Sequence, residues 1–585
     1  MAKIKSTLAS SFTGTIYLFL LQLFSRSITF ILNQILLRFT SAKVLGIVNI
    51  KLELILETIL FISREGIRMA LLRSKSSSEE TDKKLRNENE KENEKENNTS
   101  KVKKALIPIQ KAVNLSYIPI IIGCSLTLLV TFYFNRKQNL NPEESHTSII
   151  LYSIAALLEL VSEPLYILTQ YYLMFNIRVK AEGFAVFIRS ISSFIFTIYL
   201  NYRYKVVTSE AAVLCFAWSQ LLYSVFLYGT YSFLFWRKYL SIKKKEELDT
   251  ESLHLSQGIK AFLPTPINEK NESGEIKKYY FDEHLLSLSV TLYIQSFVKY
   301  LLSQGDKIIL NILCNSTTQG VYAFVMNYGS LILRIVFQPL EETCRIYFSK
   351  ELVSKVSTPS SRQQVYKVIM TILKCHFILG MYFVFFATNY TGVLIDLLAG
   401  SNWSRNSMAP LALAFYCISI PFMGFNGILE GFVQAVAPKK ELHYQSRMMT
   451  IFWIVFAGCC FLFVKVFHLG IIGIILGNMV NMSLRIYTCY QYLINYYKKS
   501  EERKDLKEIH PINTISKEPL VWVCFIVSWI IGYYMNGIIG WETLKQKAIY
   551  VFIGMILALI STAILCWKEK SFLREFKEYY RILRS

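Results

Sequence analysis

The chain has 585 residues, of which 53% are hydrophobic and 14% aromatic, and this composition excludes an ordinary soluble protein of several domains. A net charge of +22 often indicates a nucleic-acid-binding protein. Here the excess Lys and Arg lie in short connections between apolar segments, where they report membrane topology, so we expect no nucleic-acid partner. The eleven Cys and seven His show no ligand spacing, and we expect no metal and no cofactor.

Stretches of about twenty mostly apolar residues predict transmembrane helices. Six such stretches occur in the first part of the chain, six in the second and two near the C-terminus. The predicted spans are 15–37, 44–64, 112–134, 148–175, 183–201, 209–236, 284–303, 318–340, 366–389, 408–430, 448–467, 470–494, 519–538 and 547–566. Because each segment must satisfy its own backbone hydrogen bonds in lipid, the sequence predicts an all-α membrane protein with about 14 transmembrane helices.

The spans group into domains. A first six-helix half is expected over 1–236 and a second over 284–497, followed at 498–585 by a cytosolic loop, two additional helices and a cytosolic tail. The polar connection 237–283 is expected to be a cytosolic linker without a functional role. Residues 74–104 are rich in Asn, Glu and Lys and have no apolar face to bury, so they are expected to form a disordered cytosolic loop.

The charges of the connections predict the orientation. The alternate connections that include both termini hold 45 Lys and Arg, whereas the opposite set holds nine, so both termini are expected in the cytosol. N-x-[ST] glycosylation acceptors at Asn315, Asn389 and Asn402 lie on the opposite side, but acceptors also occur on the cytosolic side. The acceptors are therefore a weak topology signal.

The chain also shows a faint internal repeat. Gly46 has a counterpart 274 positions later at Gly320. Each block ends its second span in Glu-x-x-Arg, as Glu65 with Arg68 and as Glu342 with Arg345. Since both blocks have six spans and begin on the same side, they are expected to be parallel repeats around a central cavity.

Several basic residues lie deep inside predicted spans, where a charge costs about 2.5 to 3.5 kcal/mol on insertion scales. The candidates for a cationic, substrate-binding cavity are Arg26, Lys51, Arg189, Lys299, Arg334 and Arg485. The alternative is a structural role in ion pairs with acids inside the bundle, namely Glu53, Glu57, Glu159 and Glu163. Lys465, Lys547 and Arg64 lie near span ends and are expected to extend to the headgroups.

Charged residues on span two and span eight could line the cavity, form a gate or serve as structural contacts. Glu53, Glu57 and Arg64 form a stripe on one helix face, which either lines the cavity or clamps span two to a neighbour. Glu65 with Arg68 and Glu342 with Arg345 have the i, i+3 spacing at which side chains meet. They form either a cytosolic gate or simple interfacial anchors.

With these residues in place, the chain resembles the Rft family of endoplasmic-reticulum membrane proteins, a branch of the polysaccharide exporter, MATE and MurJ-like superfamily. The resemblance covers nearly the whole chain. It rests on Arg26-Ser27 through Asn33-Gln34, Ser63-Arg64-Glu65-Gly66-Ile67-Arg68, Gln304-Gly305-Asp306-Lys307, Gln338-Pro339-Leu340-Glu341-Glu342 with Arg345, and Glu430-Gly431-Phe432.

The resemblance implies a MATE/MurJ-like fold and a part in asparagine-linked glycosylation. It implies transport of a dolichyl-diphosphate carrying a seven-sugar oligosaccharide from the cytosolic to the luminal leaflet of the endoplasmic-reticulum membrane. The implied partners are this lipid substrate, membrane lipids and the N-glycosylation machinery. Arg26, Arg334 and Arg485 would meet the diphosphate, and the gate pairs would open and close the cytosolic side.

Other functions remain as alternatives. A non-transporting accessory or chaperone protein for the lipid-linked oligosaccharide would need the same cationic cavity. A polytopic glycosyltransferase would need acids in a sizeable first luminal loop, which here runs only from Arg38 to Lys43. A cation-coupled drug exporter would favour acidic residues. The sequence contains no G-x-x-x-x-G-K-[ST] and no H-E-x-x-H motif, and we expect that the protein is not an enzyme.

Overall fold

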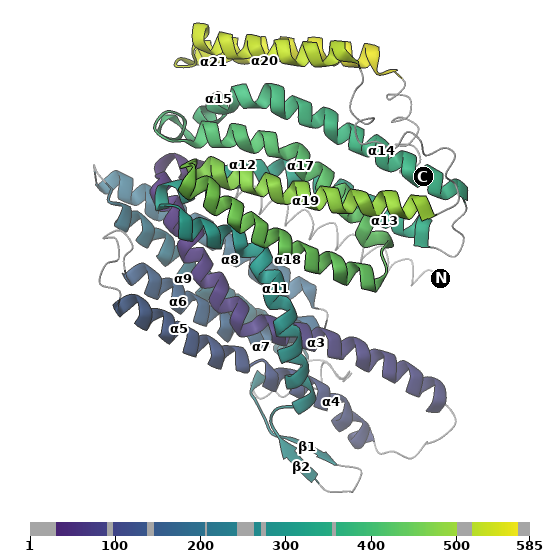
Figure 1. Cartoon of the computed structure of the whole chain (residues 1–585). Coiled ribbons are helices and arrows are strands. Elements are labelled where there is room, and N and C mark those ends of the chain that lie inside the picture. Colours follow the sequence, from purple (N-terminus) through teal and green to yellow (C-terminus); the bar gives the residue numbers. More distant parts are fainter. Residues whose placement is uncertain are drawn as a thin grey trace. The chain divides into compact units, whose positions relative to one another are not determined.

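The structure is a computed structural model that describes residues 31–89, 98–136, 146–172, 174–204, 207–242, 262–270, 276–353, 359–499 and 518–570. These residues are mostly helical (Figure 1). They form two compact units: unit 1 includes 47–304, and unit 2 includes 41–46 and the chain from 305 onward. Each unit is described by itself.

Unit 1 is a helical bundle with one small hairpin. In it, α9 packs against α6 and α8, while α3 packs against α5 and α6. Its elements are η1 (Ile47–Leu52, a π-helix), α3 (Glu53–Asn89), α4 (Asn98–Leu115), α5 (Ile118–Arg136), α6 (His146–Val161), α7 (Glu163–Tyr171), α8 (Phe175–Arg203), α9 (Ser209–Ile242), β1 (Ile267–Lys270), β2 (Ile276–Tyr279) and most of α11 (Glu283–Leu313).

The fourth predicted span, 148–175, is broken in two at Ser162. Pro164 lies at the beginning of α7, where its missing N–H costs no helical hydrogen bond. The Ser162 hydroxyl donates to the Glu159 carbonyl at 2.6 Å. The break leaves Glu159 at the end of α6 and Glu163 at the beginning of α7, and both side chains are buried.

The linker contains structure that the sequence did not predict. β1 and β2 form an antiparallel hairpin, which Figure 1 shows beside α4. Asn114 of α4 is fully buried; its amide donates to the carbonyls of Thr265 and Tyr280, both at 2.8 Å. Its carbonyl accepts from the Thr265 N–H at 3.0 Å, and Lys111 pairs with Asp282 at 2.9 Å. These contacts fasten the linker to α4.

Unit 2 is built around α17, which packs against α12, α13, α14, α15 and α19. Its first element, α2, packs against α12. The elements are α2 (Ala42–Gly46), α12 (Ser316–Ile332), η3 (Leu333–Phe337), α13 (Gln338–Val353), α14 (Pro359–Tyr382), η4 (Phe383–Ala387), α15 (Thr388–Ala399), α16 (Ser401–Ser404), α17 (Ala409–Val436), α18 (Lys439–Phe461), η5 (Leu462–Val466), α19 (Gly470–Lys499), α20 (Pro519–Ile539) and α21 (Leu544–Lys568).

The C-terminal pair α20 and α21, yellow in Figure 1, is held within unit 2 by buried ion pairs. Lys374 of α14 lies 2.7 Å from Glu569 just after α21. Lys547 of α21 bonds to Asp396 of α15, so the expectation that Lys547 extends to the headgroups is wrong. Its ammonium has a carboxylate partner within the protein, where a paired charge is cheaper than an unpaired one.

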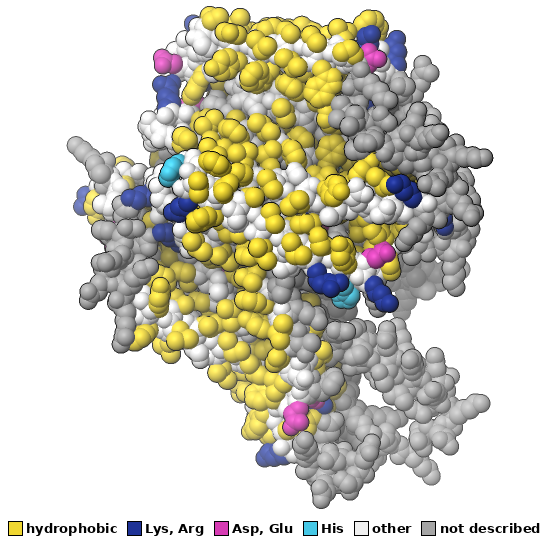
Figure 2. Space-filling model, viewed as in Figure 1, with side chains coloured by type: hydrophobic (Ala, Val, Ile, Leu, Met, Phe, Trp, Pro, Cys, Tyr) yellow, Lys and Arg dark blue, Asp and Glu magenta, His cyan; other side chains and the backbone are white. Residues whose placement is uncertain are grey.

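Eleven helices in the described parts of the chain are long and apolar enough to span a membrane. They correspond to eleven of the fourteen predicted spans and confirm a multi-span helical membrane protein. Of the other three, 15–37 lies mostly outside the described residues, 44–64 lies in α2, η1 and α3, and 284–303 lies in α11. Figure 2 shows hydrophobic side chains covering the visible face over α18, α20 and α21, as lipid contact requires.

Two predicted boundaries differ from the structure. α3 continues to Asn89 and α4 begins at Asn98, so much of the expected loop 74–104 is helical; Glu and Lys are good helix formers even without an apolar face. The units divide at Gln304 and Gly305 rather than in the linker 237–283. The reason is that the linker packs on α4 and belongs to unit 1.

Candidate functional site: charged clusters within the helices

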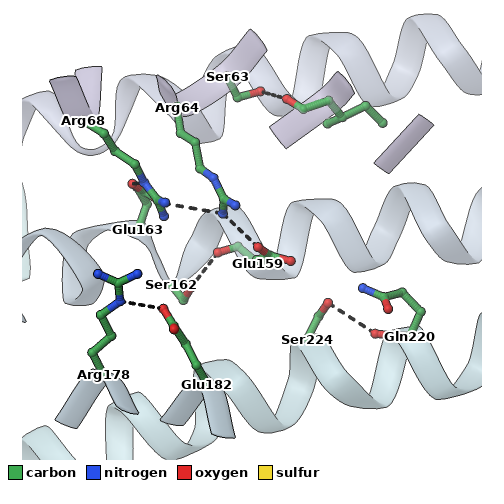
Figure 3. A network of polar contacts seen from close by, with 11 residues as sticks. Ser63, Arg64, Arg68, Glu159, Ser162, Glu163, Arg178, Glu182, Gln220 and Ser224 are labelled. Atoms are coloured by element: carbon green, nitrogen blue, oxygen red, sulfur yellow. Dashed lines mark hydrogen bonds and ion pairs between the residues drawn. The ribbon is translucent and has the colours of Figure 1, made fainter. Parts of the chain in front are cut away.

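Unit 1 contains a cluster of ion pairs that joins α3 to α6 and α7 (Figure 3). Arg68 holds Glu163 through two bonds, Nε to Oε1 at 2.5 Å and Nη2 to Oε2 at 2.7 Å. Arg64 donates to Glu159 at 2.9 Å, so the expectation that Arg64 extends to the headgroups is wrong. The Glu163 side chain is 0% exposed, so its charge and lone pairs must be satisfied by the protein.

Tyr166 of α7 extends this cluster toward α8. The guanidinium of Arg68 lies 3.7 Å from the centre of its ring, and that of Arg178 lies 5.1 Å from it. Such cation–π contacts are stronger where water is excluded. Arg178 also pairs with Glu182 on the same helix at 2.9 Å, and both side chains are partly exposed, 36% and 41%.

Arg68 does not form the expected i, i+3 pair with Glu65. Its carboxylate partner is Glu163 on another helix, whereas Glu65 is a half-buried residue of α3. The physical reason is that a buried carboxylate accepts a bidentate guanidinium more strongly than an interfacial one. Arg64 and Arg68 therefore form structural ion pairs with Glu159 and Glu163. This is the alternative that was stated for the buried acids.

Unit 2 contains a second polar cluster, on α13, α17 and α19. Arg485 of α19 donates to Glu430 at 2.5 Å. Arg345 of α13 donates to Gln434 at 3.2 Å, and Gln434 in turn donates to Glu430 at 3.2 Å. Arg345 is thus bound to α17 and not to Glu342, so the expected pairing of these two residues is wrong. Glu342 is exposed on α13.

The two Glu-x-x-Arg arginines make equivalent contacts in the two blocks. Arg68 reaches Glu163 on the helix of the fourth predicted span, and Arg345 reaches Gln434 on the helix of the tenth, which is the fourth of its block. The partner is a carboxylate in one block and a neutral amide in the other. Sequence comparison of the blocks found the arginines but not these partners.

Arg189 and Arg334 differ from the other deep arginines because their described hydrogen-bond partners are neutral. Arg189 of α8 donates to Gln220 of α9 at 3.1 Å and lies 5.5 Å from the ring of Tyr223. Arg334 is exposed and donates to the Ser330 hydroxyl at 2.6 Å. A guanidinium without a carboxylate retains its charge for an anion.

Arg334 and Lys51 share another feature, since each lies in a π-helical segment, η3 and η1 respectively. A π-helical turn inserts a residue into an α-helix and is frequent at functional sites. Lys465 lies in a third such segment, η5. The sequence predicted the depth of Lys51 and Arg334 and placed Lys465 near a span end, but it gave no indication of the π-helical backbone.

The remaining predicted site residues are placed as follows. Arg26 lies outside the described residues, and Lys299 is on α11 with a side chain outside them. Glu53 and Glu57 are half-buried on α3. No group of three or more metal-binding side chains occurs among the residues that the structure describes.

Two functional residues were not singled out as site residues from the sequence, Glu430 and Gln434. Glu430 is the acid that neutralises Arg485, and its depth at the end of span ten was the available signal. Beside Arg485, a cavity of about 360 Å³ lies between α18 and α19, with Met448, Phe452 and Tyr487 among its walls. Such an amphipathic wall suits a lipid or another amphipathic molecule.

This fold and these clusters define a polytopic α-helical membrane protein that keeps charged side chains within its spans. The family model described as "Rft protein" matches residues 10–579. The chain belongs to the Rft protein family, which confirms the resemblance seen in the sequence.

Similar proteins cover nearly the whole chain. The "Man(5)GlcNAc(2)-PP-dolichol translocation protein RFT1" of Saccharomyces cerevisiae is 31% identical over 94% of this chain and 93% of its own length. The protein of the same name from Kluyveromyces lactis is 29% identical over 96% of both. A solved structure titled "Lipid II flippase MurJ, inward closed conformation" has a TM-score of 0.53 at 13% identity and covers 94% of this chain and 99% of its own length, so the fold is MurJ-like.

Proposed function

We propose that this protein moves a dolichyl-diphosphate oligosaccharide across the endoplasmic-reticulum membrane for protein N-glycosylation. The observation that carries the proposal is the similarity to relatives named as translocation proteins, which extends over 94% to 96% of the chain. The MurJ-like fold agrees with a carrier of a lipid-linked headgroup. The activity breaks no covalent bond, so the protein is a transporter and not an enzyme.

The proposed arrangement in the membrane has fourteen spans, in two parallel six-helix halves followed by the C-terminal pair α20 and α21. The equivalent contacts of Arg68 and Arg345 to the fourth helix of their blocks support the duplication. Both termini are cytosolic in this arrangement, as the distribution of Lys and Arg predicts. The N-glycosylation machinery is the proposed further partner.

The proposed contacts of the substrate are electrostatic. A diphosphate is an anion that bidentate arginine recognises well. Arg334 is the best described candidate, because it is exposed, lies deep in a span and donates to a neutral hydroxyl. Arg189 and Lys51 are secondary candidates, whereas Arg64, Arg68 and Arg485 are neutralised by carboxylates.

The test uses the purified full chain in liposomes that contain dolichyl-diphosphate oligosaccharide, with a membrane-impermeant lectin reporting which leaflet holds the sugar. The protein should increase exchange between leaflets over protein-free liposomes. Arg334→Leu should reduce the exchange about tenfold, the loss of one charge-assisted hydrogen bond, at unchanged thermal stability. The matched control Arg178→Leu, at a partly exposed pair within one helix, should leave exchange unchanged.

Two outcomes would contradict the proposal. Exchange by the unsubstituted protein no faster than in protein-free liposomes would exclude direct translocation and favour the accessory role. Full exchange by Arg334→Leu would remove Arg334 from the substrate path.

A further inference from the structure

Unit 2 contains an open cavity between α18 and α19, at the ends of these helices that the charge distribution places in the cytosol. At the other end the two helices are in close contact, since a Cβ placed on Gly477 of α19 would lie 2.7 Å from the Sγ atom of Cys460 on α18. Toward the cytosol the residues of α19 that face the cavity are large, among them Tyr487, Gln491 and Tyr492. These side chains keep the helices apart and leave a volume of about 360 Å³.

A second cavity, of about 460 Å³, adjoins the first on its cytosolic side. The two share the wall residues Glu441, Tyr492 and Asn495. They therefore form one recess, lined by residues within 433–452 and 485–498, which we call the α18–α19 cleft. Lys498, in the last turn of α19, lies at its mouth.

The α18 wall of the cleft changes from polar to apolar with depth. The lining residues nearest the cytosol are Glu441 and Gln445, and those up to two turns deeper than Gln445 are Met448, Met449 and Phe452. Unbranched methionine side chains adapt to an irregular apolar surface such as a flexible hydrocarbon chain. The cleft therefore suits a ligand with a polar head at the mouth and an apolar chain inside.

The charges around the cleft favour an anion at its mouth. Lys440 and Arg447 of α18 and Lys498 of α19 are exposed, and none of the three has a carboxylate partner within the described part of the chain. The Arg447 guanidinium lies 6.0 Å from the ring centre of Tyr444, which lines the cleft. Figure 2 shows Lys and Arg side chains gathered at this end of α18, beside the hydrophobic face. Basic side chains at a membrane surface attract anionic lipids.

The other charged residues of the walls are bonded within the protein. Arg485, deep in the cleft, donates to the Glu430 carboxylate at 2.5 Å. Glu441 is the only acid among the described residues that line the two cavities, and it accepts a hydrogen bond from the Tyr492 hydroxyl. The deep part of the cleft is thus electrically balanced, and the positive charge is concentrated at the mouth.

We infer that the α18–α19 cleft binds one glycerophospholipid with an anionic headgroup, drawn from the cytosolic leaflet. Its headgroup lies among Lys440, Arg447 and Lys498, and an acyl chain lies between the helices against Met448 and Phe452. The volume is in the range that holds a small ligand, and a seven-sugar headgroup is too large for it. The site is therefore separate from the proposed substrate contacts, and the inference does not depend on the proposed transport.

The first experiment locates the lipid. The purified full chain in detergent is mixed with phosphatidylserine that carries a photoreactive diazirine in one acyl chain, or with the matching phosphatidylcholine probe. After illumination and proteolysis, the peptides that contain Met448 and Thr488 should carry about tenfold more label from phosphatidylserine. Peptides of α20 and α21, whose exposed hydrophobic side chains contact lipid without a basic cluster, are the internal control and should be labelled equally by both probes.

The second experiment removes the charge of the mouth. A chain that carries Lys440→Gln, Arg447→Gln and Lys498→Gln should lose the preference for phosphatidylserine at unchanged thermal stability without lipid. A matched chain loses the same charge from exposed lysines on other helices, through Lys180→Gln, Lys350→Gln and Lys367→Gln. This control should keep the preference.

A third variant fills the cleft without changing its charge. Met449→Trp places a larger side chain among the apolar residues of the wall and should lower labelling of the α18 and α19 peptides by both probes at least fivefold. Labelling of α20 and α21 in the same sample should stay constant.

Three outcomes would overturn the inference. Equal labelling of α18 by the two probes would show no recognition of the headgroup. Loss of the preference in the control chain as complete as in the mouth variant would show an effect of net charge only. Displacement of the probe by dolichyl-diphosphate oligosaccharide but not by unlabelled phosphatidylserine would assign the cleft to the substrate. Because leaflet exchange is not measured, failure of the proposed function would leave these results unaffected.

Discussion

At the scale of single residues, the partner of each buried arginine decides what it can do. Arg68 and Arg485 have carboxylate partners, whereas Arg334 has a hydroxyl. The sequence predicted that Arg334 and Arg485 lie at membrane depth, because their spans are apolar and charges are rare within them, and it placed Arg68 near the cytosolic end of span two. It did not predict the partners, because Glu163 and Glu430 come from helices far away in the chain, and their distance depends on tertiary packing.

The pair of Arg68 and Glu163 should be essential for stability. Arg68→Met removes both hydrogen bonds from the fully buried Glu163 carboxylate to Arg68 and leaves only Arg64 at 3.9 Å, so it should cost about 3 to 5 kcal/mol of unfolding free energy. Arg68→Met combined with Glu163→Met should recover much of this loss, because no unpaired charge remains. Unfolding of the detergent-solubilised protein measures both. Arg178→Met, at a pair that is more than a third exposed, is the control and should cost less than about 1 kcal/mol. Equal losses for the single and double variants would contradict this account.

Asn389 should carry no glycan although it lies in an acceptor motif. Its side-chain nitrogen, the atom that would bear the sugar, donates to the Trp529 carbonyl at 2.9 Å, and a Cβ on Gly532 would lie 2.7 Å from it. Endoglycosidase treatment should therefore give the same gel shift for Asn389→Ala as for the unsubstituted chain. Asn389→Ala should also lower stability by about 1 kcal/mol, whereas Asn402→Ala, at an exposed acceptor, should not. A glycan lost with Asn389→Ala would refute the assignment.

At the scale of elements, the helices were predictable and their interruptions were not. Apolar length predicted the spans, since lipid permits few alternatives to a helix. The hairpin of the linker was missed because its stability comes from Asn114 of α4 rather than from its own polar sequence. The break at Ser162 is a similar case: Pro164 suits the beginning of a helix, but the division of the span depends on how α7 packs.

The linker should detach from α4 when Asn114 is replaced. Asn114→Ala removes the hydrogen bonds to the backbone of Thr265 and to the carbonyl of Tyr280, at about 0.5 to 1.5 kcal/mol for each bond lost. Amide hydrogen exchange over β1 and β2 should become at least tenfold faster. Lys111→Met, which removes a partly exposed ion pair, is the control and should change exchange less. Protection that survives Asn114→Ala would show that the hairpin is held by other contacts.

At the scale of the whole molecule, the family and the general class were predictable from sequence, because scattered motifs and fourteen apolar segments extend along the chain. The division into compact units was not predictable from composition. Polarity suggested a boundary in the linker, but Asn114 ties the linker to unit 1 and the packing against α12 assigns α2 to unit 2. Such assignments depend on contacts between residues hundreds of positions apart.

The close contact of α2 with α12, where Gly46 meets Gly320, also has a consequence for biosynthesis. Gly46 is made 274 residues before Gly320, which at ordinary translation rates is a delay on the order of tens of seconds. The helices of unit 1 can assemble during this interval, since nearly all of their partners precede Gln304. The small-residue face of α2 has to wait for α12 to enter the membrane. Insertion of α12 into the membrane is therefore the step that completes its contact with α2, which is synthesised much earlier.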